Sequence, residues 1–140
     1  MTGTSGDVKI RRAAVDAMIA HARLDAPNEC CGLLVGAGTL IDEAVRVRNI
    51  EAGPARYTLD PAEHIAVNAR LRGSGRAVLG AYHSHPRTSA TPSPSDLAEA
   101  FYPDFVYVIV SLARPDRPEC RGWRIRAGAA VEVGLAVAEE

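Results

Sequence analysis

The chain has 140 residues, of which 47% are hydrophobic and 24% are charged, and this is the length and composition of one globular domain. Its net charge of −1 gives no general attraction to nucleic acid or to an anionic membrane surface. No apolar run approaches the roughly 20 residues that a membrane-spanning helix needs. These features argue against a basic nucleic-acid binder and against a helical membrane protein.

The cysteines and the N-terminus indicate a cytoplasmic protein. There are three cysteines, Cys30, Cys31 and Cys120, and two of them are adjacent. An odd number with adjacent members does not suit a disulfide framework, so we expect a reducing compartment. The first residues, MTGTSGDVKIRR, lack the apolar core of a signal peptide.

The first part of the chain predicts a strand, a helix and further strands. Residues 1–6 are small and polar and are expected to form a loose tail. Apolar residues recur at helical spacing within residues 11–24, which predicts a helix. Strands are predicted at 8–10, 30–36 and 39–49, with a turn and a short strand within 53–60.

The next helix has clear start signals. Asp60 can cap it, Pro61 suits its first position, Glu63 is placed to complete a capping box, and Gly73 ends it. Strands follow at 76–84, 104–112, 119–128 and 129–137, with a short helix at 93–102; the strand at 104–112 is the most apolar and is expected to be central. The pattern predicts a mixed α/β (α+β) domain over residues 1–140, with about six strands and two or three flanking helices.

Two of the four histidines lie in the stretch GAYHSHPRTSATPSPSD. His83 and His85 are two apart on a predicted strand, so they share a face and lie roughly 6.5 to 7 Å apart between Cα atoms. Pro86 ends the strand and leaves His85 at its rim. Asp96, carried back by a short loop, is the candidate third ligand. Two histidines and one carboxylate form a common hydrolytic zinc site with a fourth position open for water.

Each piece of this site also has a structural explanation. Two histidines at this spacing can simply be partly exposed. Ser93 and Pro94 followed by Asp96 form a good helix start without any metal. Glu29, directly before an apolar strand, can supply the carboxylate that takes a proton from water, although an exposed loop position is commoner for glutamate. The metal interpretation gains weight because all the pieces fit one site.

Together these residues resemble the JAMM (MPN+) metalloprotease motif, which reads E, then H-S/T-H-P, then S-x-x-D. The matching residues are Glu29, His83, Ser84, His85, Pro86, Ser93 and Asp96, at the expected spacing. The resemblance covers most of the chain and is strongest to the small bacterial stand-alone members. These include peptidases that act on adducts of ubiquitin-like sulfur-carrier proteins. The resemblance implies a JAMM/MPN-type, cytidine deaminase-like fold.

The resemblance also implies the roles of five residues. His83, His85 and Asp96 correspond to the ligands of a Zn²⁺ ion. Glu29 corresponds to the general acid/base that takes a proton from the activated water, and Ser93 to the donor that steadies the tetrahedral oxyanion.

Three neighbouring features remain open at this point. Ser84 points to the opposite face from His83 and His85, so we expect it to pack or to support the site. Cys31 shares the face of Glu29 and is either a buried inert thiol, a wall of the site or a zinc ligand. A Cys-His nucleophilic hydrolase would need an orienting base that is not evident.

The implied activity is zinc-dependent hydrolysis of the amide bond after the C-terminal Gly-Gly of a ubiquitin-like sulfur-carrier protein, such as release of cysteine from a carrier-cysteine adduct. Glu29 and His83 are only 54 positions apart, which leaves no room for the large insertions that grip ubiquitin. The glycine tail is expected to add as a strand beside a sheet edge near the metal. The alternatives are a deubiquitinase-like isopeptidase and a non-catalytic MPN-type scaffold. No basic stripe with interleaved aromatics suggests nucleic acid as a partner, and a homodimer stays open.

Overall fold

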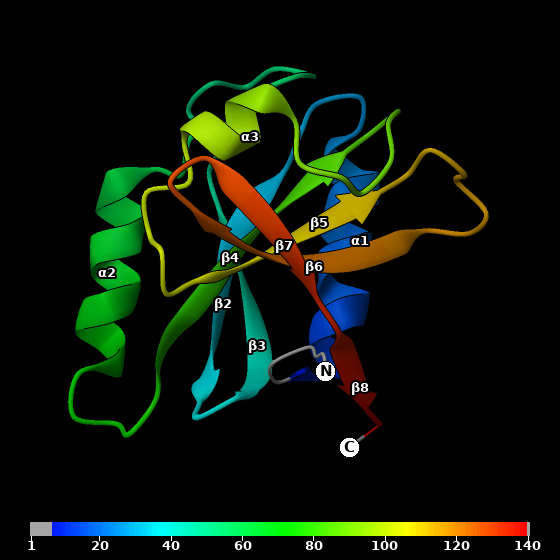
Figure 1. Cartoon of the computed structure of the whole chain (residues 1–140). Helices are drawn as coiled ribbons and strands as arrows, with labels where there is room; N and C mark the ends of the chain where they lie inside the picture. Colours follow the sequence, from blue (N-terminus) through cyan, green and yellow to red (C-terminus); the bar gives the residue numbers. More distant parts are fainter. Residues whose placement is uncertain (1–6, 140) are drawn as a thin grey trace.

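The computed structural model describes residues 7–139, so the predicted loose tail at 1–6 lies outside the described residues. These residues form a mixed sheet with three helices (Figure 1). In chain order the elements are β1 (Val8–Arg11), α1 (Arg12–Asp25), β2 (Cys31–Ala37), β3 (Leu40–Val47), α2 (Pro61–Leu71), β4 (Ala77–His85), α3 (Pro94–Ala98), β5 (Val106–Ser111), β6 (Glu119–Arg126), β7 (Ala129–Val133) and β8 (Leu135–Ala138). The fold class is as predicted, but the sheet has eight strands rather than about six.

One of the additional strands arises at the ends of the sheet, which curls back on itself so that the last predicted strand is divided into β7 and β8. The strand order is β7-β6-β5-β4-β2-β3-β1-β8, yet β7 and β8 are consecutive in the chain and only Gly134 separates them. The single strand predicted at 129–137 is therefore wrong, because the chain leaves one end of the sheet and joins the other. The Val8 amide donates to the Gly134 carbonyl at 2.9 Å. A Cβ atom at Gly134 would lie 2.4 Å from Asp7 Oδ1, so a larger residue there would require the exposed Asp7 side chain to move.

Helices cover the sheet on both faces, as the alternating side chains of its strands require. In Figure 1, α1 lies behind the sheet and α2 stands at its left. On the α1 face the core includes Leu34, Tyr82 and Val108. On the α2 face the neighbouring residues Leu33 and Ala81 pack instead. The apolar β5 is buried throughout and lies inside the sheet between β4 and β6, as expected for a central strand.

The start of α2 is capped partly as predicted. Asp60 is the cap, and its carboxylate accepts from the Ala62 amide at 2.9 Å. Glu63 does not complete a capping box, because its carboxylate accepts instead from the amide of Arg48, at 2.8 Å. Glu63 thereby ties the first turn of α2 to the end of β3.

Two other predicted elements differ from the structure. The short strand within 53–60 is absent, and an isolated bridge between Asn49 and Leu59 closes this segment as a loop. The helix predicted at 93–102 ends at Ala98. Within residues 7–139 no helix is both long and apolar enough to cross a membrane.

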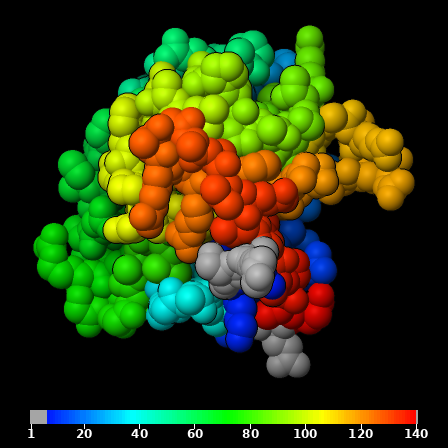
Figure 2. All heavy atoms as spheres, in the orientation of Figure 1, coloured from blue at the N-terminus to red at the C-terminus, as the bar shows by residue number. Residues whose placement is uncertain are grey.

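The surface view in Figure 2 shows the hairpin of β6 and β7, in orange and red, lying across the front of the molecule. The loop between β5 and β6 projects at the right in both views. β4 and β5 run parallel, with His85 opposite Ser111, so the ends of both strands lie at the same end of the sheet. The candidate site lies at this end, beneath α3.

Candidate metal centre and active site

The two motif histidines lie at the end of β4, on the same face and almost fully buried. The exposed fraction is 1% for His83 and 4% for His85. Their Nε2 atoms are 3.2 Å apart. The strand ends at His85, as the following proline predicts.

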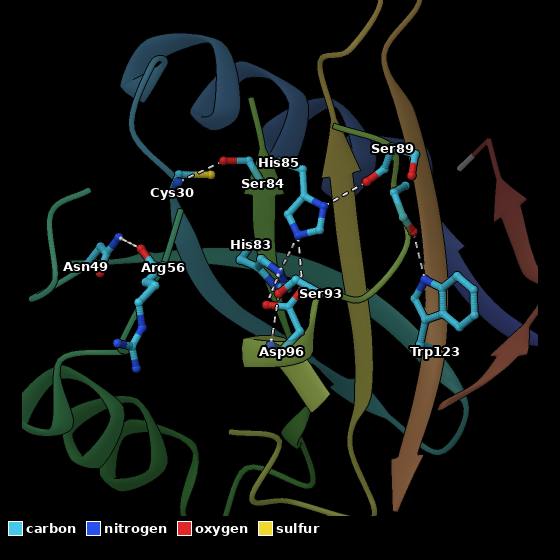
Figure 3. A network of polar contacts seen from close by, with 11 residues as sticks. Cys30, Asn49, Arg56, His83, Ser84, His85, Ser89, Ser93, Asp96 and Trp123 are labelled. Atoms are coloured by element: carbon cyan, nitrogen blue, oxygen red, sulfur yellow. Dashed lines mark hydrogen bonds and ion pairs between the residues drawn. The ribbon is translucent and has the colours of Figure 1, made fainter. Parts of the chain in front are cut away.

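Asp96 joins the histidines from the first turn of α3. Its Oδ1 lies 3.1 Å from His83 Nε2, and its Oδ2 lies 3.0 Å from His85 Nε2. The three buried side chains each offer a ligand atom within 4.8 Å of the others. Figure 3 shows them converging between β4 and α3. The structure thus brings together the three residues that the sequence singles out, in an arrangement that can hold a metal ion.

The chemistry of this cluster fits a cation at its centre. His85 Nδ1 lies 2.7 Å from the Ser89 carbonyl, which only accepts, so Nδ1 carries a proton and Nε2 is left to face Asp96. Burial lowers the pKa of both histidines, but for His85 the hydrogen bonds to Asp96 and Ser89 outweigh it and raise the pKa. Burial alone would raise the pKa of Asp96, yet its contacts with the two histidines hold that pKa well below the usual range. The carboxylate and the imidazoles thus need a positive charge between them, which a proton or a metal ion supplies.

Glu29 is buried beside this cluster rather than exposed in a loop. It lies two residues before β2 begins, and only 6% of the residue's surface is exposed. Burial raises the pKa of Glu29 to about 7, while His85 lowers it and Asp96 raises it. Among residues 7–139 its Oε1 has no hydrogen-bond partner. A buried carboxylate whose pKa lies near neutrality has the properties of a general acid/base.

Ser84 fastens the Glu29 segment to β4. It points to the opposite face from the histidines, as expected, and its hydroxyl accepts from the Cys30 amide at 2.8 Å. The Ser84 amide in turn donates to the Cys30 carbonyl at 3.1 Å. Ser84 therefore links the strand that carries both histidines to the residue that follows Glu29 (Figure 3).

Ser93 caps α3 with a full capping box. Its hydroxyl accepts from the Asp96 amide at 3.1 Å, and its own amide donates to Asp96 Oδ2 at 2.9 Å. The structural explanation of this stretch thus holds, and it also fixes the orientation of Asp96. Because the cap uses the hydroxyl oxygen only as an acceptor, the hydroxyl proton is available for another partner.

The thiol of Cys31 is not part of the cluster. It pairs with His83 across the sheet, but its thiol points toward the Val47 carbonyl, with sulfur and oxygen 3.6 Å apart. Burial raises the pKa of the thiol to about 12. These features favour a buried inert thiol, which was the default expectation.

Two residues at the site did not stand out in the sequence. The ring of Tyr57 stacks on the ring of His83, with centroids 4.2 Å apart. The Asn49 side chain donates to the carbonyl of Glu29 at 3.1 Å. Both come from the segment between β3 and α2, where no pattern of charge or periodicity distinguishes them.

An apolar groove of about 410 Å³ adjoins the cluster and begins at Tyr57. Ile65 on α2 and Phe101 after α3 line it, and they are 69% and 74% exposed. The remaining lining residues are Thr58, Leu59, Pro61, His64, Asn68, Ala81, Glu99, Tyr102 and Tyr107. Exposed apolar side chains gathered beside a polar cluster are typical of a surface that binds another molecule.

Comparison with known proteins identifies the family. A model of prokaryotic homologs of the JAB domain matches residues 11–126. The CysO-cysteine peptidase of Mycobacterium tuberculosis is 38% identical over 140 residues, 99% of this chain and 96% of the relative. The desampylase of Haloferax volcanii is 35% identical over 115 residues, 77% of this chain and 83% of the relative.

A solved structure agrees with these relatives. Protein DSY2949 of Desulfitobacterium hafniense superposes with a TM-score of 0.87 at 34% identity, and the match covers 95% of this chain and 94% of that protein. The chain belongs to the prokaryotic JAB-domain family and is a hydrolase of the JAMM (MPN+) class.

Proposed function

We propose that this chain is one zinc-dependent JAMM peptidase domain that acts in the cytoplasm on a ubiquitin-like sulfur-carrier protein. It hydrolyses the amide bond after the Gly-Gly tail of the carrier, for example to release cysteine from a carrier-cysteine adduct. The convergence of His83, His85 and Asp96 beside the buried carboxylate of Glu29 is the main structural support. The name of the mycobacterial relative supports the choice of substrate.

His83, His85 and Asp96 would hold the metal. Two imidazoles and a carboxylate are the donor set that zinc uses in hydrolytic sites. A zinc ion bound there supplies Lewis acidity, which polarises a carbonyl and lowers the pKa of water. Ser89 and Ser93 support the ligands, since one accepts from His85 Nδ1 and the other binds Asp96 through its amide.

Glu29 moves the proton. Its carboxylate takes a proton from the attacking water and delivers it to the nitrogen of the leaving amine. A pKa of about 7 suits both directions, because the group is neither too weak a base nor too weak an acid near neutral pH. Ser93 directs its free hydroxyl proton to the developing oxyanion, while its oxygen remains the cap of α3.

The groove beside Tyr57 would receive the body of the carrier. It adjoins the cluster through Tyr57, which both lines the groove and stacks on His83. β4, which carries both histidines, offers no free edge for the tail, because β2 and β5 already pair with it. We propose instead that the tail passes over Tyr57, where glycine residues permit close approach of the backbone.

The test compares three substrates with the zinc-loaded protein at matched concentrations. They are a carrier extended by one cysteine after Gly-Gly, the same carrier joined to a lysine side chain of a protein, and diubiquitin. Mass spectrometry follows the products, and metal analysis should give about one zinc per chain. We expect trimming of the extended carrier. Faster cleavage of the lysine-linked conjugate would favour the isopeptidase alternative, which the desampylase relative supports. Absence of bound zinc would favour the non-catalytic scaffold.

A further inference from the structure

We propose that Asn49 is the positioning residue for Glu29. This inference rests on the role proposed for Glu29 as general acid/base. Asn49 lies just beyond the end of β3, and it organises the loop of residues 49–58, here called the Asn49 loop. The loop in turn holds the backbone of Glu29.

The amide side chain of Asn49 uses its full hydrogen-bonding capacity. Its Nδ2 donates to the carbonyls of Glu29 at 3.1 Å and Arg56 at 3.2 Å. Its Oδ1 accepts from the amides of Glu51 at 2.9 Å and Thr58 at 3.0 Å. Two carbonyls at one end and two N–H groups at the other fix the orientation of the amide. Figure 3 shows the contact with Arg56.

The Asn49 loop contacts Glu29 on both sides of its backbone. The Glu29 amide donates to the Gly53 carbonyl at 2.8 Å, and the Glu29 carbonyl accepts from Asn49. The ends of the loop are joined by the Ile50 amide, which donates to the Thr58 carbonyl at 3.0 Å. Asn49 therefore connects one end of the loop, at Thr58, and the residue Arg56 within it to the backbone of Glu29.

Glu29 depends on this support because its own backbone lies outside the sheet, and the bonds from Ser84 hold only the next residue, Cys30. The ladder of β2 begins at Cys31, after Glu29. Within the described part of the chain, Oε1 of Glu29 has no hydrogen-bond partner. The position of the carboxylate therefore follows from the position of its backbone. A displacement of about 1 Å at a reacting group can cost about 10²-fold in rate.

Asn49→Asp and Asn49→Ala distinguish the contribution of the donor end of the amide from that of the acceptor end. Aspartate keeps both acceptor bonds within the loop but loses both donor bonds, to the carbonyls of Glu29 and Arg56, and alanine loses all four bonds. Glu51→Ala is the matched control. It removes the bond from Thr58 Oγ1 to Glu51 Oε2 in the same loop, at 3.1 Å, and leaves the Asn49 bonds in place. Every variant is prepared as the full, zinc-loaded chain.

Three quantities are measured for each variant. They are zinc per chain, kcat and KM on a carrier extended by cysteine, and amide hydrogen exchange by NMR. Asn49→Ala should keep its zinc and lose about 10- to 100-fold in kcat with little change in KM. The Glu29 amide should exchange at least about 10-fold faster, while the Ser84 amide stays protected. Asn49→Asp should show both effects as well, because its second carboxylate oxygen would face the carbonyl oxygens of Glu29 and Arg56 without a proton between them. Glu51→Ala should match the parent.

Two results would overturn the proposal. One is parent-like kcat and parent-like exchange at Glu29 in both Asn49 variants. The other is a loss of zinc in step with the loss of activity, which would place the effect at the metal through Tyr57. If the parent cleaves no carrier adduct, the proposed function fails, and exchange at Glu29 in Asn49→Ala still decides whether Asn49 holds that backbone.

Discussion

The ring of Tyr57 lies against the ring of His83, with centroids 4.2 Å apart and planes 19° from parallel. His83 is only 1% exposed, and its Nδ1 has no hydrogen-bond partner among residues 7–139. His85, by contrast, is oriented by the Ser89 carbonyl. If His83 is a metal ligand, as we propose, packing against Tyr57 takes the place of the hydrogen bond that usually fixes a metal-binding histidine.

Replacing Tyr57 by alanine should weaken zinc retention by about 10-fold or more, because the ring of His83 loses its stacking partner and gains access to water. Competition with a chelator measures this directly. Tyr57→Phe preserves the stacked ring and should retain zinc like the parent. Equal retention in the alanine and phenylalanine variants would show that stacking does not support the ligand.

His85→Ala should lose most of the bound zinc, since it removes one of three ligand atoms and the one that Ser89 orients. Metal analysis of the purified protein is the measurement. His64→Ala is the matched control, because His64 lies on α2, outside the cluster, and its loss should leave zinc content unchanged. Full occupancy in the His85 variant would contradict the ligand assignment.

Local spacing predicted the part of the site that lies within one short stretch of chain. His83 and His85 share a face because a strand repeats every two residues, and Asp96 returns because Ser93 and Pro94 start a helix. Both signals depend only on residues close together in the chain, so they can be recognised in the sequence. The placement of Glu29 against this cluster needed the family resemblance, because 54 positions of chain separate it from His83.

Contacts between distant segments set the features that the sequence did not predict. The crossing at Gly134 exists because the two ends of the sheet meet, and this closure depends on all eight strands together. Glu63 does not complete its expected capping box because Arg48, directly after β3, presents a free amide to it. The stacking of Tyr57 likewise appears only once the loop after β3 folds over β4. No local pattern encodes these pairings.

Glu29→Gln should keep zinc and fold but lose nearly all turnover, because glutamine matches the shape of glutamate and cannot accept the proton. Single-turnover rates and metal content, measured on the same preparation, test this. Activity within a few-fold of the parent would remove Glu29 from the mechanism. Loss of zinc together with activity would instead make it a metal ligand.

Ser93→Ala should slow turnover by about 10²- to 10³-fold through loss of the oxyanion donor, and it should also cost about 1 kcal/mol of stability through loss of the cap. Ser93→Gly separates the two roles, because glycine is a fair cap but has no hydroxyl. It should be as slow as Ser93→Ala and almost as stable as the parent. If turnover recovers in the glycine variant along with stability, the cap is the whole contribution of Ser93.

The buried carboxyl of Glu29 should make the metal-stripped protein less stable as pH rises. Burial raises the pKa of Glu29 from 4.5 to about 7 in the folded state. The folded protein therefore holds this proton more tightly than the unfolded chain, so the stability that Glu29 contributes is full below pH 4.5 and falls as pH rises toward 7. Glu29→Gln has no such proton to lose. In thermal unfolding with a chelator present, the variant should match the parent near pH 4.5 and exceed its Tm by about 3 °C or more at pH 8. A Tm difference that stays constant between these two pH values would show that Glu29 ionises in the folded protein as it does in water.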